Sequence, residues 1–174
     1  MATVPIAPAT STANVKHAVP FFGVIDMERS LKFYIDGLGF KMKYRWIPGP
    51  DEGNPEGKIK WCWLELGEGA LMLQEFRKEG ENNIYLEGKI TEIPKNLGAG
   101  VSINFQCDDS LALYREFKSR GVEIPKRPFV GNGMWCLNVV DPDGYKLWFN
   151  SPTDAPEESV LQEDGSIVPG SCES

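Results

Sequence analysis

Two charged residues at predicted strand ends, Glu75 and Lys146, are the candidates for acid–base chemistry in this chain of 174 residues. A glutamate in an apolar cleft has a raised pKa and can act as a general base, and a nearby lysine can stabilise an enolate or another oxyanion. The alternative is a salt bridge or two solvated charges, which are common at strand ends. Nucleophilic catalysis is disfavoured, because the sequence has no Gly-x-Ser-x-Gly elbow and only one histidine, His17.

Strand alternation indicates where a small molecule could bind. In the segment 101–107, Ser102, Asn104 and Gln106 share one strand face. Near the end of the chain, Trp148 lies between Lys146 and Asn150 on one face. A large aromatic residue among polar neighbours is typical of ligand pockets. An ordinary solvated sheet face and a packing tryptophan are the alternatives.

These residues belong to a pattern that occurs twice, in segments 16–77 and 99–151. Each copy predicts a strand, a helix and three further strands. Asp26 and Asp109 stand where the N-caps of the two helices should be, and a glycine follows each helix. The chain is then expected to return as strands over 40–47 and 122–125. We therefore predict one domain, 16–151, built from two modules.

Charge and composition limit the partners. Residues 152–174 contain six of the 25 acidic residues and no Lys or Arg. The rest of the chain therefore has 19 acidic and 18 basic residues. The body is nearly neutral and has no basic stripe, so no nucleic acid partner is expected. We expect a flexible arm over 1–15, a solvated acidic tail over 152–174 and no membrane span. The cysteine spacing suits reduced thiols, which predicts a cytoplasmic protein.

The repeated modules, the Val-Ile-Asp-Met-Glu-Arg-Ser-Leu-Lys-Phe-Tyr run at 24–34, Gly37-Leu-Gly-Phe40 and Asp141-Pro-Asp-Gly-Tyr-Lys-Leu147 resemble the vicinal oxygen chelate superfamily, which includes glyoxalase I and the bleomycin-resistance proteins. The resemblance covers about residues 17–151. It implies an α+β fold in which two βαβββ modules form a curved mixed sheet around a cleft. It also implies a homodimer. Metal-dependent members place one ligand in the first and one in the last strand of each module.

The four positions that correspond to those metal ligands carry Val19, Leu73, Ser102 and Trp148. None is a usual ligand for a divalent ion, whose sites need imidazole and carboxylate groups. A displaced site with His17 and Glu75 is the alternative, although two groups do not make a well-ordered site. We therefore expect no cofactor.

The chain thus resembles the metal-free, bleomycin-resistance-like branch, whose members bind and sequester a small organic molecule. The alternative is an enzyme of the same superfamily, of lyase, isomerase or dioxygenase type, that acts through Glu75 and Lys146 or through a displaced metal. Trp61 and Trp63 share a strand face and either join the cleft or cover a helix. The predicted ligand-binding residues are Val19, Phe21, Trp63, Leu73, Ser102, Asn104, Gln106 and Trp148.

Overall fold

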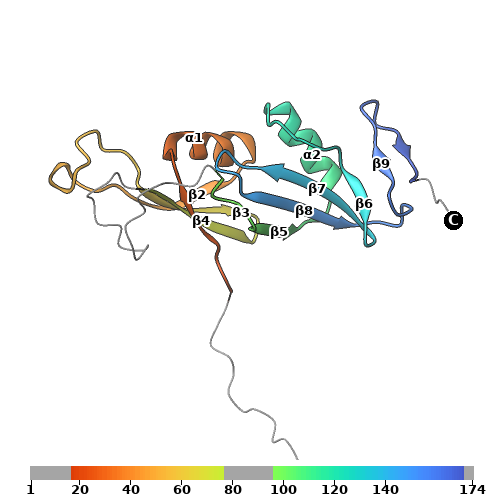
Figure 1. Ribbon diagram of the computed structural model, residues 1–174, viewed down its shortest axis with the longest axis horizontal. Coiled ribbons are helices and arrows are strands. Elements are labelled where there is room, and N and C mark those ends of the chain that lie inside the picture. Colours follow the sequence, from red (N-terminus) through yellow and green to blue (C-terminus); the bar gives the residue numbers. More distant parts are fainter. Residues whose placement is uncertain (1–16, 77–95, 171–174) are drawn as a thin grey trace, which may run out of the picture.

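The computed structural model describes residues 17–76 and 96–170, which form two mixed sheets side by side along the long axis of the molecule (Figure 1). The first sheet has the strand order β1-β4-β3-β2. Its module contains β1 (Phe21–Val24), α1 (Met27–Leu31), the π-helical turn η1 (Lys32–Gly37), β2 (Lys41–Trp46), the 3-10 turn η2 (Pro50–Glu52), β3 (Trp61–Leu66) and β4 (Gly69–Glu75).

The second sheet has the order β10-β9-β6-β7-β8-β5. Its elements are β5 (Ser102–Gln106), α2 (Ser110–Ser119), β6 (Phe129–Gly131), β7 (Met134–Val140), β8 (Lys146–Pro152), β9 (Val160–Leu161) and β10 (Ile167–Val168). In both modules the first strand pairs in parallel with the last, β1 with β4 and β5 with β8. The predicted α+β fold of two βαβββ modules is confirmed.

Both helices begin at the predicted aspartates. Asp26 Oδ1 accepts a hydrogen bond from the Arg29 amide at 3.0 Å, and Asp109 Oδ1 accepts one from the Ala112 amide at 2.9 Å. Each carboxylate satisfies an amide that has no partner within its helix. Gly39 follows the first helix with φ +83°, a conformation that favours glycine.

The predicted return strand over 122–125 is wrong, because the second module returns as β6. Val122 is nearly buried and Ile124 is partly buried, and both pack in the core that the two modules share. Pro125 has no amide hydrogen to donate to a sheet. The apolar residues that suggested a strand therefore belong to a loop that closes the core.

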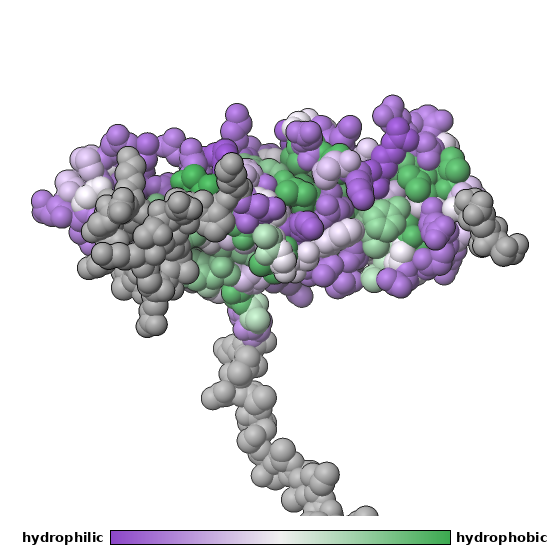
Figure 2. Space-filling view, viewed as in Figure 1, coloured by the Kyte–Doolittle hydropathy of each residue, from purple (hydrophilic) through white to green (hydrophobic). Residues whose placement is uncertain are grey.

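One core lies between the helices and the two sheets. It includes residues of both modules, and the rings of Phe22 and Tyr145 stack across the seam between the modules with centroids 4.0 Å apart. Figure 1 shows α1 and α2 on the same side of the sheets. The opposite side of each sheet, which no described helix covers, is called the helix-free face below. Figure 2 shows hydrophobic residues reaching the surface in separate patches between larger hydrophilic areas.

The expected solvated tail over 152–174 is wrong for part of its length. Strands β9 and β10 extend the second sheet (Figure 1), and Leu161 packs with Val130 and Trp135 in a small second core. The segment contains six acidic residues, but the packing of Leu161 and the backbone hydrogen bonds between residues 128–130 and 158–161 attach it to the sheet. The predicted arm over 1–15 and residues 171–174 lie outside the described residues.

Within residues 17–76 and 96–170, no helix combines the length and the apolar composition that crossing a bilayer requires.

Candidate functional site

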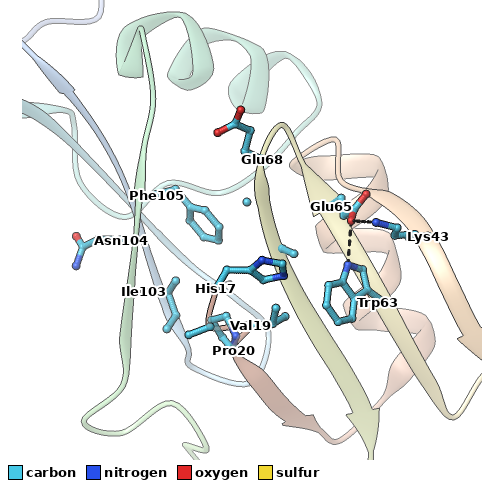
Figure 3. A pocket seen from close by; sticks show the side chains of 13 residues that line it. His17, Val19, Pro20, Lys43, Trp63, Glu65, Glu68, Ile103, Asn104 and Phe105 are labelled. Atoms are coloured by element: carbon cyan, nitrogen blue, oxygen red, sulfur yellow. Dashed lines mark hydrogen bonds and ion pairs between the residues drawn. The ribbon is translucent and has the colours of Figure 1, made fainter. Parts of the chain in front are cut away.

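A cavity of about 790 Å³ lies at the seam, between strand β5 and the β3–β4 hairpin (Figure 3). Its wall contains residues 17–20 before β1, Lys43 of β2, Trp63 and Glu65 of β3, residues 68–70 of the hairpin and residues 103–105 of β5. The cavity is therefore built by both modules. Each wall is a strand or a strand extension that the sheets hold in place.

Local chemistry explains the shape of this seam. The Met72 amide donates to the Pro20 carbonyl at 2.8 Å, which continues the β1–β4 pairing beyond β1 and fixes the segment 17–20 beside the cavity. On the other side, a Cβ atom at Gly69 would come within 2.9 Å of the Phe105 ring. Because Gly69 has no side chain, Phe105 can approach the hairpin. In Figure 3, Ile103 and Phe105 point toward the hairpin and His17 lies in the middle of the cavity.

One carboxylate orients the tryptophan of the cavity. Glu65 Oε1 accepts hydrogen bonds from Trp63 Nε1 at 3.1 Å and from Lys43 Nζ at 2.6 Å. The hydrogen bond with Lys43 lowers the pKa of Glu65, and the same bond raises the pKa of Lys43. Both groups therefore carry their charges at neutral pH. The Glu65 carboxylate can hold the indole ring of Trp63 against a ligand. Neither Glu65 nor Lys43 is ready to exchange a proton near pH 7.

Two of the predicted ligand-binding residues, Val19 and Trp63, line the seam cavity, and Asn104 borders it through its position in β5, although its side chain points to the other side of the strand from Ile103 and Phe105 (Figure 3). Four others lie outside its lining on the helix-free faces: Phe21, Ser102, Gln106 and Trp148. The register of β5 and β8 places Ser102 beside Lys146, Asn104 beside Trp148 and Gln106 beside Asn150. The polar strand face and the tryptophan thus form one surface.

Tryptophans 61 and 63 also lie on the helix-free face. Cys62 and Leu64, which alternate with them, are fully buried in the core. Across the ladder, Trp61 pairs with Trp46 and Trp63 pairs with Tyr44. Of the two alternatives for Trp61 and Trp63, covering a helix is excluded, since the helix lies on the other side of the sheet.

The expected position of Leu73 in the cleft is wrong. Its side chain is fully buried in the core beneath α1. Glu75 shares this face of β4, where its Oε2 accepts a hydrogen bond from the Met27 amide at 3.0 Å and its Oε1 forms an ion pair with Lys60. Glu75 therefore stabilises the start of α1 and does not face the cavity.

The predicted catalytic pair is likewise not formed in the chain. Lys146 is exposed on the helix-free face of the second sheet, whereas Glu75 lies on the helix side of the first. Strand alternation alone separates them, because residues on opposite faces of a sheet point in opposite directions. No proton relay between Glu75 and Lys146 follows from this geometry.

The family's metal positions carry residues that do not fit a divalent ion. Val19 and Leu73 have hydrocarbon side chains, and Ser102 and Trp148 offer a hydroxyl and an indole. The alternative metal site, with His17 and Glu75 as ligands, is not formed either, since His17 lines the cavity and Glu75 is on the opposite side of β4. Within residues 17–76 and 96–170, no group of three or more His, Cys, Asp or Glu side chains could hold a metal ion.

Sequence reasoning missed Lys43, Glu65 and Phe105. Glu65 lies two residues after Trp63, so alternation alone would have placed it on the same face. Phe105 alternates with the polar residues of β5 and packs against the shared core. Its place in the cavity wall depends on how closely the two modules approach, which no local pattern encodes.

Comparisons with known proteins agree with this architecture. The profile of the glyoxalase/bleomycin resistance protein/dioxygenase superfamily matches residues 14–149. No curated protein matches the chain. Among solved structures, TioX from Micromonospora sp. ML1 is similar, with a TM-score of 0.59 and 17% identity over 79% of this chain and 99% of that chain.

Two further similar structures are of proteins that bind antibiotics. TnmS3, an antibiotic binding protein from Streptomyces sp. CB03234, has a TM-score of 0.53 and 21% identity over 80% of this chain and 98% of its own. A bleomycin-binding protein complexed with bleomycin has a TM-score of 0.51 and 21% identity over 79% of this chain and 98% of its own. At identities this low, the similarity shows only that these proteins share the fold. Together with the profile match, the two βαβββ modules show that the chain belongs to the glyoxalase/bleomycin resistance protein/dioxygenase superfamily.

Proposed function

We propose that the protein binds a small organic molecule in the seam cavity and holds it without transforming it, as a sequestration or resistance protein does. The observation that carries this proposal is the cavity of about 790 Å³ with Trp63 held in its wall. Ligand pockets commonly measure roughly 300–1,000 Å³ and combine aromatic surface with a few fixed polar groups. Trp63, Phe105 and the Lys43–Glu65 pair are such a combination.

The similar solved structures support the same class of ligand. A bleomycin-binding protein and the antibiotic binding protein TnmS3 have this fold. By analogy, a planar or partly aromatic molecule of drug-like size is the first kind of compound to test.

Binding without metal-dependent chemistry is the simpler proposal for these residues. The usual ligand positions carry side chains that do not fit a divalent ion, and Glu75 is already engaged by the Met27 amide and Lys60. The enzyme alternative therefore finds no support in the pair Glu75 and Lys146. It predicts turnover that disappears in Glu75→Gln, whereas sequestration predicts that the ligand is recovered unchanged.

We further propose that the protein is a homodimer. Because the two sheets lie side by side (Figure 1), the helix-free face around Trp63 does not oppose the one around Trp148 in one chain. A second copy would allow the two faces to oppose, covering Tyr44 and Val140, which are 56% and 37% exposed. Light scattering should give twice the chain mass, and Tyr44→Glu should reduce it. A monomer at micromolar concentration would contradict the dimer.

A cytoplasmic location is proposed from the cysteines. Cys62, Cys107 and Cys136 are free thiols, as is usual in a reducing compartment. Fractionation of the source cells tests this directly.

The binding proposal is tested by a thermal-shift and tryptophan-fluorescence screen of aromatic drugs and metabolites. A ligand should raise the melting temperature in a concentration-dependent manner. Trp63→Leu should weaken binding by on the order of 2 kcal/mol, about thirtyfold, if the ring is a central anchor. Trp61→Leu is the matched control, because Trp61 has the same strand face and similar burial but does not line the cavity. Equal affinity in both variants, or a modified ligand in mass spectrometry, would contradict the proposal.

A further inference from the structure

Three asparagines form a row on the helix-free face of the second sheet, at neighbouring positions of β5, β8 and β7. Asn150 Nδ2 donates a hydrogen bond to Asn104 Oδ1 at 3.1 Å, and Asn104 belongs to the strand that borders the seam cavity, with its side chain on the other side of β5 from Ile103 and Phe105 (Figure 3). Asn150 itself is only 6% exposed. The row therefore begins on the strand that separates it from the seam cavity and continues into a buried position.

The row ends in two polar atoms that are buried without a partner. Within the part of the chain that the structure describes, neither Asn150 Oδ1 nor Asn138 Nδ2 has a hydrogen-bond partner. One is an acceptor and the other a donor. In the β7–β8 ladder, Asn138 pairs with Trp148 and Asn150 pairs with Cys136, so the two amides are diagonal neighbours on one face.

An aromatic pair lies over the same place. The rings of Phe129 and Trp148 meet edge to face with centroids 6.3 Å apart, although β7 separates their strands. The two rings therefore reach over β7 on the helix-free face, next to the amides.

Unpaired buried amide atoms are costly. Each has lost its hydrogen bonds to water without gaining one in the protein, and folded proteins contain few such atoms. A buried donor and a buried acceptor at diagonal positions match a group that can both accept and donate a hydrogen bond. An amide presents a carbonyl oxygen to the donor and an N–H to the acceptor, whereas a carboxylate or a ketone presents acceptors alone.

We propose that Asn138 and Asn150, beneath Trp148, form a subsite for a carboxamide-type group of the bound molecule: an amide, a lactam or a ureide. Asn138 Nδ2 donates to its carbonyl oxygen, and Asn150 Oδ1 accepts from its N–H. The subsite rests on the proposed function and deepens it, since Asn104, which accepts the hydrogen bond from Asn150, belongs to the strand that borders the seam cavity. It adds a polar specificity that Trp63 alone does not provide.

The test uses the full chain, labelled with ¹⁵N, and three probes of similar shape: benzamide, benzoate and acetophenone. Benzamide should shift the side-chain amide signals of Asn138 and Asn150 and the indole N–H signal of Trp148, and it should bind more tightly than the other two. Asn138→Leu should weaken benzamide binding about five- to tenfold, the usual value of one hydrogen bond, and should weaken acetophenone binding as well, because both carbonyl oxygens accept from Asn138 Nδ2. Benzamide binding no tighter than acetophenone binding, or unaffected by Asn138→Leu, would overturn the subsite.

Stability gives an independent readout. If Asn138 is kept for a ligand, Asn138→Leu should raise the melting temperature of the ligand-free protein, since it removes an unpaired buried donor. Asn54→Leu is the matched control. Asn54 Nδ2 donates to the carbonyls of Pro48 and Lys58 at 2.9 Å each, so this variant should lose stability. A loss in Asn138→Leu as large as in Asn54→Leu would show that Asn138 has a structural partner, and would overturn the subsite.

The two proposals can fail separately. If Trp63→Leu weakens the binding of screened ligands while Asn138→Leu does not change benzamide binding, the proposal of a binding cavity is retained and the carboxamide subsite is rejected. If benzamide binding depends on Asn138 while Trp63→Leu changes no ligand's affinity, the subsite remains and the seam cavity loses its role.

Discussion

Tyr34 of the first module donates a hydrogen bond from its hydroxyl to Asp141 Oδ2 of the second module, at 2.9 Å. Both residues are buried, at 0% and 4% exposure. The other oxygen of Asp141 accepts from the amides of Asp143 and Tyr145, so the β7–β8 turn keeps its shape while it inserts beside the first helix. Asp143 adds an ion pair with Arg29 at 2.8 Å. These contacts hold the two modules together and so define the seam cavity.

Replacing Tyr34 with Phe should weaken this connection. The variant leaves Asp141 Oδ2 buried without its donor, which costs about 1–3 kcal/mol. Urea unfolding should show the loss as a lower midpoint with an unchanged slope. Tyr44→Phe is the control, because Tyr44 is 56% exposed and its variant should match the parent protein. Equal midpoints for the two variants would contradict the structural role of Tyr34.

Stability should depend on pH through Asp141. Burial raises the pKa of this carboxyl from 3.8 to about 6. Between these values the folded protein holds more protons than the unfolded chain, so the contribution of Asp141 to stability falls as pH rises and levels off above about pH 6. Asp141→Asn, which stays neutral, should therefore gain stability relative to the parent protein across this range.

The measurement is urea unfolding of both proteins at several pH values, with Asp154→Asn as the control at an exposed position. A difference between Asp141→Asn and the parent protein that does not vary with pH would show that Asp141 does not titrate in this range.

Metal retention should be far below one ion per chain. The family's ligand positions carry Val19, Leu73, Ser102 and Trp148, none of which binds zinc, nickel, iron or manganese well. Elemental analysis after incubation with each metal and desalting tests this. His17→Ala separates weak binding at the single histidine from a built site. Near-stoichiometric metal in both proteins would direct attention to lyase and dioxygenase assays.

Leu161 should attach the C-terminal strands to the second sheet. Its side chain is 4% exposed and packs with Val130 and Trp135. Leu161→Ala should cost about 2–5 kcal/mol, the usual range for removing a buried leucine side chain. Ile167→Ala, at a residue that is 46% exposed, should change the melting temperature little. If both variants melt alike, the small core around Leu161 does not contribute to global stability.

Local patterns in the sequence identify much of this fold. The N-caps at Asp26 and Asp109 follow from their own carboxylates, and the strands at 102–106 and 146–152 follow from alternation. Two copies of one pattern predict two modules of one kind. These features depend on residues within a few positions of each other, which is why a sequence can reveal them.

The candidate site required the tertiary structure. Alternation shows that Leu73 and Glu75 share a strand face, but the helix crossing over the sheet decides that this face is the covered one. The same crossing leaves Trp61 and Trp63 on the helix-free face. The sequence by itself determined which residues point the same way, because a strand repeats every two residues. The packing of the two modules decided which of those sets line the seam cavity, because that contact joins residues far apart in the chain.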